Sequence, residues 1–224
     1  MKGKTFLPLL GYALVYLFLI RSPGATDGHD IQLSERTLKS AETKYGQEAR
    51  QRLVAWLELV ENGKQKTAVE KLGLANNFFN RIPFEPDTEH WGKRDYWATP
   101  VETLASNGGD CEDYAIGKYF TLLALGVGVD RLRITYVKAK TRDPADQAHM
   151  VLTYYPEPDA MPLVLDNLDP EIKPASERAD LVPVYSFNGN GLWLASERNS
   201  GRLLGGSGQI DLWAELNARI NRKF

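Results

Sequence analysis

Apolar residues recur every three or four positions through the first half of the chain, which is the spacing of an amphipathic helix. Over residues 34–61 these positions are Leu38, Ala41, Tyr45, Ala49, Leu53, Trp56 and Val60. We expect one long helix there, ended by Gly63, and a second helix over residues 67–80, closed by prolines. After an irregular, aromatic-rich link over residues 84–100, a short helix is expected at 100–105. Another helix should begin with Asp110 as its N-cap and end at Gly126.

Beyond Gly128 the spacing of apolar residues changes to alternation, which is typical of strands. Strands are predicted at residues 132–139, 149–155, 162–166, 182–187 and 191–195. A glycine-rich segment at 201–208 then leads to a last amphipathic helix over 210–220. Helices followed by a meandering antiparallel sheet predict an α+β fold.

The first 25 residues differ from the rest of the chain. Lys2 and Lys4 precede an apolar run from Phe6 to Ile20, and small residues follow it. This pattern predicts a secretory signal peptide, with an uncleaved signal-anchor as the alternative. Residues 26–224 are then expected to form a single domain. The formal net charge of -2 and the pI near 6 give no electrostatic case for nucleic-acid binding.

The chain contains one cysteine, Cys111, and it stands among acids in the segment GDCED. An exported protein with one thiol cannot form an internal disulfide, which leaves an intermolecular bridge, a reactive group or a small buried residue. The predicted helix places Cys111 in its first turn, where the helix dipole favours a thiolate. The carboxylates of Asp110, Glu112 and Asp113 oppose it, because negative charge disfavours thiolate formation.

Two further residues complete a candidate triad. His149 opens one predicted strand and Asp166 closes the next, so antiparallel pairing brings both side chains to one edge of the sheet. His149 can then take the proton of Cys111, and Asp166 can orient the imidazole. From spacing alone, His149 can equally be a surface residue and Asp166 a turn former.

Several segments together resemble one protein family. They are residues 95–104 (DYWATPVETL), 109–119 (GDCEDYAIGKY), 148–151 (AHMV), 163–168 (LVLDNL) and 185–188 (YSFN). The sequence from about residue 45 to 193 is similar to the bacterial transglutaminase-like cysteine proteinases, the LapG-type periplasmic proteases. The resemblance implies a papain-like, transglutaminase-type core with Cys111, His149 and Asp166 as the catalytic triad.

The same resemblance implies an activity and its partners. Members of the family are periplasmic and calcium-dependent. They cleave the N-terminal region of a large calcium-binding surface adhesin at a pair of alanines, which releases cells from biofilms. An inner-membrane receptor for cyclic di-GMP holds them inactive through its periplasmic domain.

The resemblance also places Ca²⁺ at Asp110 and Glu112, with Asp113 a weaker match. Ca²⁺ takes six to eight oxygen ligands and would neutralise such a cluster. We expect the remaining ligands to be backbone carbonyls, including some from the loop near Asp130, and the ion to be structural. The alternative is that these acids only cap the helix and complement its dipole.

Other residues and functions stay open from the sequence. The amide of Cys111 is one expected oxyanion donor, and Trp97 is a weak candidate for the second. His29 is expected to be unstructured, and Glu89 and His90 to be surface residues. The alternative activity is transglutaminase or amidase-type acyl transfer through the same thioester. A third interpretation, a calcium-binding interaction module with a silent thiol, leaves His149 and Asp166 unexplained.

Overall fold

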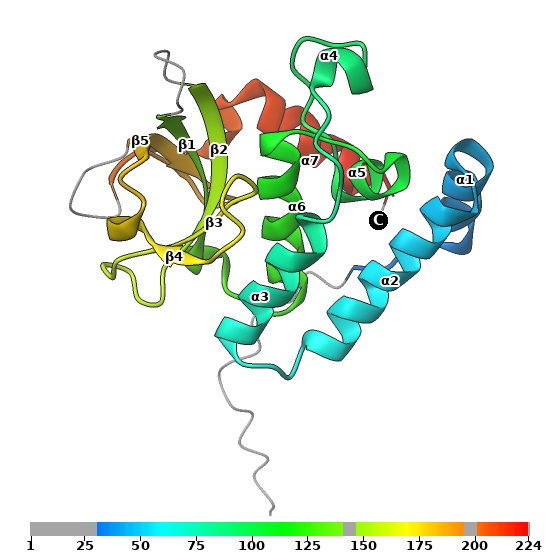
Figure 1. Cartoon of the computed structure of the whole chain (residues 1–224), viewed down its shortest axis with the longest axis horizontal. Coiled ribbons are helices and arrows are strands. Elements are labelled where there is room, and N and C mark those ends of the chain that lie inside the picture. Colours follow the sequence, from blue (N-terminus) through cyan, green and yellow to red (C-terminus); the bar gives the residue numbers. More distant parts are fainter. Residues whose placement is uncertain (1–30, 141–146, 195–200, 224) are drawn as a thin grey trace, which may run out of the picture.

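The computed structural model describes residues 31–140, 147–194 and 201–223, so the predicted signal peptide and His29 lie outside the described residues. Helices come first along the chain, as Figure 1 shows. They are α1 (Glu35–Tyr45), α2 (Gln47–Gly63), α3 (Ala68–Phe79), α4 (Asp87–His90), α5 (Pro100–Ser106) and α6 (Cys111–Ala124). Strands follow, and α7 (Asp211–Lys223) comes last. None of these helices has the length and apolar character that crossing a membrane requires.

The strands form one antiparallel sheet in the order β4-β3-β2-β1-β5-β6-β7. Their bounds are β1 (Leu132–Ala139), β2 (Gln147–Tyr154), β3 (Leu163–Leu165), β4 (Lys173–Pro174), β5 (Leu181–Phe187), β6 (Leu192–Leu194) and β7 (Arg202–Gly205). The central pair β1 and β2 is in register over its full length, with Tyr136 opposite Met150 and Val137 opposite His149. The predicted α+β fold is therefore confirmed.

The expected long helix over residues 34–61 is two helices, and that prediction was wrong at one point. Gly46 separates α1 from α2 with φ 88°, a left-handed conformation that glycine adopts without steric cost. Its N–H still donates to the carbonyl of Glu42 at 2.9 Å. The apolar spacing continues across the break because both helices turn the same stripe toward α5.

Helix α6 lies between the sheet and helices α1, α2 and α5, and it belongs to two apolar cores (Figure 1). Toward the sheet, Ile116, Tyr119 and Leu122 join residues of β1 and β2. On its other side, Tyr114 and Ala124 join the core of α1, α2 and α5. A helix held on both sides fixes the position of whatever stands at its first residue.

Some short elements were not expected from the sequence. The link over residues 84–100 contains the one-turn helix α4, and the glycine-rich segment contains β7. Strand β4 has two residues at the edge of the sheet. Such pieces are too short to show a hydrophobic period, so the pattern of the sequence does not reveal them.

Candidate active site

Cys111 is the first residue of α6, as predicted, and it is partly buried. Its Sγ donates a hydrogen bond to Oε2 of Glu112 at 3.0 Å. Burial and the negative charge of Glu112 and Asp110 raise the pKa of the Cys111 thiol, while a hydrogen bond from the backbone of Met150 opposes the rise. The thiol is therefore protonated in this arrangement, and its reactive form requires a compensating positive charge.

His149 and Asp166 form a buried hydrogen-bonded pair at the end of the sheet. His149 Nε2 lies 2.7 Å from Asp166 Oδ1. Strands β2 and β3 are antiparallel with Leu152 opposite Leu165, so Asp166, the next residue, lies diagonally across from His149. Asp166 follows β3 directly, whereas His149 is the third residue of β2 rather than its first. The expected meeting of these two side chains at one sheet edge is present.

Further donors hold the Asp166 carboxylate. Arg178 donates from a terminal guanidinium nitrogen to Oδ2 at 2.7 Å, and the backbone N–H groups of Asn167 and Leu168 donate to Oδ1. Burial alone would raise the pKa of Asp166, but the hydrogen bonds from His149 and Arg178 outweigh burial and lower it to about 2. Asp166 is therefore an acceptor at neutral pH, so Nε2 of His149 carries the proton between them. The other ring nitrogen, Nδ1, is then available to accept a proton.

The sulfur of Cys111 lies against the strand that carries His149. The backbone hydrogen bond that stabilises the thiolate comes from Met150, the residue after His149. Helix α6 packs on β2 through the core that contains Met150 and Leu152. In this arrangement the thiol proton is directed to Glu112 and not to the imidazole. The three residues thus lie at one end of α6 and β2, and their catalytic roles stay a prediction.

The acids around Cys111 belong to a larger cluster. Asp87, Asp110 and Asp113 each offer a carboxylate oxygen within 4.8 Å of the others, and Asp87, Asp95 and Glu112 do the same. Asp87 and Asp95 come from the link before α5, and sequence reasoning missed them. No signal in the sequence marks them, because that link has no hydrophobic period and its acids are scattered.

Some oxygens of this cluster are buried and have no hydrogen-bond partner among the described residues. Oδ1 of Asp87, Oδ1 of Asp110 and Oδ2 of Asp113 are buried and accept no hydrogen bond from the described residues. Burial, followed by neighbouring carboxylates, raises the pKa of Asp110 to about 8 and that of Asp113 well above its usual range. Crowded oxygens with no donors suit a hard divalent cation. The acidic residues present therefore fit a metal site.

Two expectations about these acids need correction. Asp110 occupies the N-cap position of α6, but its side chain makes no capping hydrogen bond, so helix capping does not explain its presence. Asp130 lies in the short helix η1 (Val129–Arg131), which follows the C-terminal end of the fourteen-residue α6. A helix of that length spans about 20 Å, so the loop near Asp130 is at the wrong end to supply ligands.

Two other residues of the link, His90 and Trp97, contact neighbouring parts of the fold. His90 is only 11% exposed in its side chain, where a surface residue was expected, and its ring nitrogens lie 2.5 Å from Glu85 and 2.8 Å from Ser106. Glu89 is exposed, as expected. Trp97 is buried in the core and stacks on Phe187 with ring centroids 5.5 Å apart. Its role as an oxyanion donor stays a prediction.

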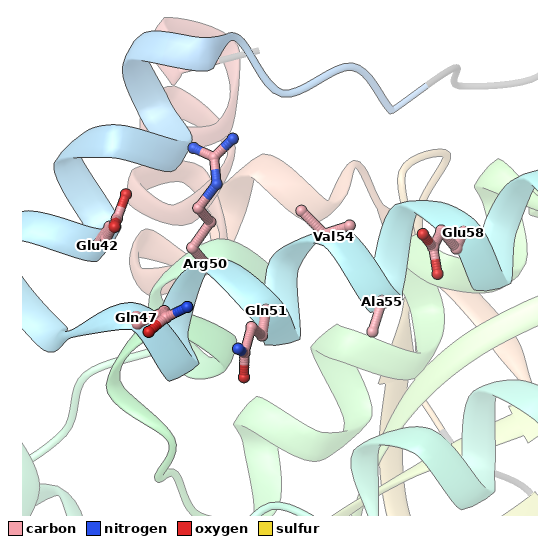
Figure 2. Close-up of a pocket in the computed structure, with 7 residues that line it drawn as sticks. All are labelled: Glu42, Gln47, Arg50, Gln51, Val54, Ala55 and Glu58. Atoms are coloured by element: carbon pink, nitrogen blue, oxygen red, sulfur yellow. The ribbon is translucent and has the colours of Figure 1, made fainter.

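A surface pocket lies elsewhere on the molecule. Figure 2 shows it between α1 and α2, lined by seven residues from Glu42 to Glu58. Arg50 in this pocket already pairs with Glu35 at 2.8 Å. The pocket contains none of the candidate catalytic residues, so it has no part in the argument for the site.

A thiol at a helix N-terminus, packed on an antiparallel sheet beside a buried histidine–aspartate pair, defines the transglutaminase-like class of cysteine hydrolases. Comparison of the chain with known protein families and solved structures agrees with that class. The family described as bacterial transglutaminase-like cysteine proteinase matches residues 43–194. The chain belongs to this family, and it is a cysteine protease.

Solved structures of a Legionella pneumophila protein are similar over most of the chain. LapG described as EGTA-treated is 44% identical, with a TM-score of 0.73, over 85% of this chain and 99% of that one. LapG described as calcium-bound is 43% identical, with a TM-score of 0.70, over 83% of this chain and 98% of that one. No curated protein matches the sequence. These likenesses confirm the expected family and the transglutaminase-like core.

Proposed function

We propose that this protein is a calcium-dependent periplasmic endopeptidase with Cys111 as nucleophile, His149 as general base and Asp166 as the residue that orients the base. The observation that carries the proposal is the buried His149–Asp166 hydrogen bond beside the helix end that presents Cys111. A structural cysteine would need neither a histidine with one ring nitrogen held by a carboxylate nor a position at a helix N-terminus.

The proposed reaction follows from which atoms hold protons. Asp166 keeps the proton of His149 on Nε2, so Nδ1 is the basic nitrogen that accepts the proton of the Cys111 thiol. The thiolate attacks the scissile carbonyl, and the imidazolium then protonates the leaving amine. Water hydrolyses the resulting thioester with His149 acting again as base. Asp166, which Arg178 also holds, stays ionised throughout and stabilises the imidazolium.

The oxyanion of the tetrahedral intermediate needs donors at the helix end. The backbone N–H of Cys111 is the donor that the position supplies, because the first N–H groups of a helix have no acceptor within it. The positive end of the dipole of α6 adds to the same stabilisation. We propose the indole N–H of Trp97, the weak candidate from the sequence, as the second donor.

Calcium is proposed to be held by Asp110, Glu112 and Asp113, together with Asp87 and Asp95. The unpartnered buried oxygens of Asp87, Asp110 and Asp113 support the assignment, as does the proximity of Asp95 and Glu112 to Asp87. One similar Legionella structure is described as calcium-bound. The cation would supply the positive charge that offsets these acids beside the thiol. The acidic residues themselves fix the turn from which Cys111 emerges.

The substrate, partner and compartment are proposed from the family resemblance. The substrate is the N-terminal region of a large calcium-binding adhesin, cleaved at a double alanine. The controlling partner is the periplasmic domain of an inner-membrane cyclic di-GMP receptor. The basic, apolar and small-residue order of residues 1–25 supports export to the periplasm. We propose that residues 26–224 form the mature single domain.

The test is cleavage of an adhesin fragment that contains the double alanine. The full chain should cleave it with Ca²⁺, and a chelator should abolish cleavage. Ca²⁺ should restore the activity far better than Mg²⁺, which demands a stricter octahedral shell. Cys111→Ala should fold normally and cleave nothing. Cleavage by Cys111→Ala near the wild-type rate would contradict the proposal. Incorporation of a labelled amine into a glutamine donor, without cleavage, would favour acyl transfer.

A further inference from the structure

Residues 96–98 lie between the acidic cluster and the C-terminal helix. On one side, Asp87 Oδ2 accepts the backbone N–H of Tyr96, and Asp113 Oδ1 accepts the backbone N–H of Ala98 at 2.7 Å. On the other side, the carbonyl of Trp97 accepts a hydrogen bond from Arg219 of α7. The backbone of residues 96–98 is thus held by the cluster at Tyr96 and Ala98 and by α7 at Trp97, and the Trp97–Ala98 peptide group is held from both sides.

These bonds determine which carboxylate oxygens face the cluster. Asp87 uses Oδ2 for Tyr96, and Asp113 uses Oδ1 for Ala98. The oxygens left over, Oδ1 of Asp87 and Oδ2 of Asp113, are the buried ones without a hydrogen-bond partner among the described residues. A shift of this segment would therefore rotate both carboxylates, and with them the oxygens that are offered to a cation.

Arg219 is well placed to prevent such a shift. Besides the carbonyl of Trp97, its guanidinium lies 3.6 Å from Oε2 of Glu102 and 4.6 Å from the centre of the Tyr96 ring. Glu102 in turn closes the capping box of α5 with Thr99. The planar guanidinium of Arg219 therefore contacts the backbone of the link, the ring of Tyr96 and the start of α5.

The helix that presents Arg219 is itself anchored in the main core. Trp213 and Leu216 of α7 are buried there, and the Trp213 ring packs edge-on against Phe187. Phe187 also stacks on Trp97. The arginine therefore acts from a fixed element, and the family match, which ends at residue 194, does not include it.

We propose that Arg219 is a positioning residue for the acidic cluster, holding residues 96–98 so that the free oxygens of Asp87 and Asp113 converge on a divalent cation. This inference rests on the proposed calcium dependence. Arg219 touches none of the proposed ligands and acts through the backbone of the link. Removal of such a supporting residue commonly weakens metal binding about 10–100-fold.

The experiment is calorimetric titration of Ca²⁺ into the full chain after removal of metal with a chelator. Arg219→Met keeps the length of the side chain but removes its donors and charge, and it should raise the Kd for Ca²⁺ by at least about tenfold. Arg219→Lys keeps the charge with one donor group and should recover part of the affinity. Arg50→Met, which removes an arginine of α2 outside the cluster, is the matched control and should bind as the wild type does.

The possible results distinguish the role of Arg219 from the calcium proposal on which it rests. An unchanged Kd for Arg219→Met, with the wild type binding Ca²⁺, overturns the role of Arg219 and leaves the calcium proposal intact. Absence of binding heat in the wild type overturns both. Thermal melts in chelator distinguish a purely structural role, which lowers the melting temperature of Arg219→Met without changing the Kd. If Arg219→Met does not fold, the affinity of Arg219→Lys decides, and a wild-type Kd there overturns the inference.

Discussion

At the scale of single residues, His149 has its two ring nitrogens in different circumstances. Nε2 is fixed on Asp166 by a 2.7 Å hydrogen bond inside the protein, whereas Nδ1 is not engaged by any described residue. The hydrogen bonds from His149 and Arg178 keep the pKa of Asp166 at about 2, so the carboxylate stays an acceptor for Nε2. This arrangement supports the proposed role of His149 as an oriented base.

His149→Ala and Asp166→Asn should each lower kcat/KM for the adhesin fragment by about 10²–10⁴-fold, because the first removes the proposed base and the second the group that orients it. Neither loss should add to that of Cys111→Ala, since residues that act as a unit are not additive. Steady-state kinetics of the single and double variants measure this. Unchanged cleavage and unchanged thiol alkylation in His149→Ala would show that another group is the base.

Gly109→Ala should weaken calcium binding and lower stability. A Cβ at Gly109 would lie 2.6 Å from Oδ2 and 2.9 Å from Cβ of Asp113, so the buried carboxylate must move. Overpacking of this kind costs about 1–3 kcal/mol in the free energy of unfolding. Denaturant unfolding and calcium titration measure the two effects.

The control for that substitution is Gly73→Ala in α3. A Cβ there meets nothing within 4 Å, so the variant should be more stable by about 0.5–1 kcal/mol, the usual helix preference of alanine over glycine. Equal behaviour of the two variants would mean that the close approach of Gly109 to Asp113 has no consequence.

The sequence predicted those candidate residues of the site that stand in a patterned context. Cys111 heads a periodic helix, His149 lies near the start of β2, and Asp166 follows β3 directly, so their positions follow from the pattern of the elements. Asp87 and Asp95 stand in a link without a period, and only the folded chain brings them to Asp110. The failure of Asp110 to cap α6 also depends on tertiary contacts, which no local pattern records.

At the scale of elements, α6 carries a buried lysine with no hydrogen-bond partner in the described structure. Lys118 is fully buried, and its Nζ lies 6.0 Å from the ring centre of Tyr114. Burial lowers its pKa to about 7, against the opposing influence of Asp166. Replacement of this buried lysine by an apolar residue should therefore stabilise the protein.

Lys118→Met should raise the free energy of unfolding most at pH 7 and below. Between the folded pKa near 7 and the unfolded value near 10.5, the unfolded wild-type chain binds more protons, so wild-type stability rises with pH across that window. The advantage of the variant should be on the order of 4 kcal/mol at pH 7, at about 1.4 kcal/mol per pKa unit, and vanish above pH 10.5. Chemical denaturation at several pH values measures it.

The matched control is Lys39→Met, because the Lys39 side chain is 69% exposed and lies 3.5 Å from Glu42 in a surface ion pair. Its effect should stay within about 0.5 kcal/mol at every pH. A pH-independent gain in Lys118→Met, or none, would mean that Lys118 finds a partner in solution.

Element types were predictable because the apolar spacing changes from helical to alternating at Gly128 and returns to helical spacing in the last helix. Strand β1 was predicted with its observed bounds, because one side of it faces α6 and period-two alternation follows from that. The break at Gly46 was not foreseen, since the apolar stripe of Leu38 and Leu53 runs through it. A glycine inside a helical pattern is compatible with both a continuous and a broken helix.

At the scale of the whole molecule, α6 couples the helical core to the sheet core. Trp56 of α2 donates from Nε1 to the hydroxyl of Thr121 in α6 at 2.8 Å. The hydroxyl of Thr121 in turn donates a hydrogen bond to the carbonyl of Gly117 at 2.7 Å. The packing of α7, through Trp213, could not be predicted, because contacts between the chain's last helix and its middle leave no local pattern.

Heating should therefore unfold both cores in one transition. Far-UV circular dichroism follows the helices and the sheet together, and tryptophan fluorescence reports Trp56 in one core and Trp213 in the other. Coincident midpoints are expected for a single domain. Two resolved midpoints would mean that the helices and the sheet are separate folding units.

The pairing of β2 with β3 also has a consequence for the protein while it is being made. Cys111 leaves the ribosome well before His149 and Asp166, and those two meet only when the later strand has emerged and paired. A partly synthesised chain therefore carries the proposed nucleophile without its base. The order of the strands along the chain therefore keeps the proposed hydrolytic activity absent while the protein is being synthesised.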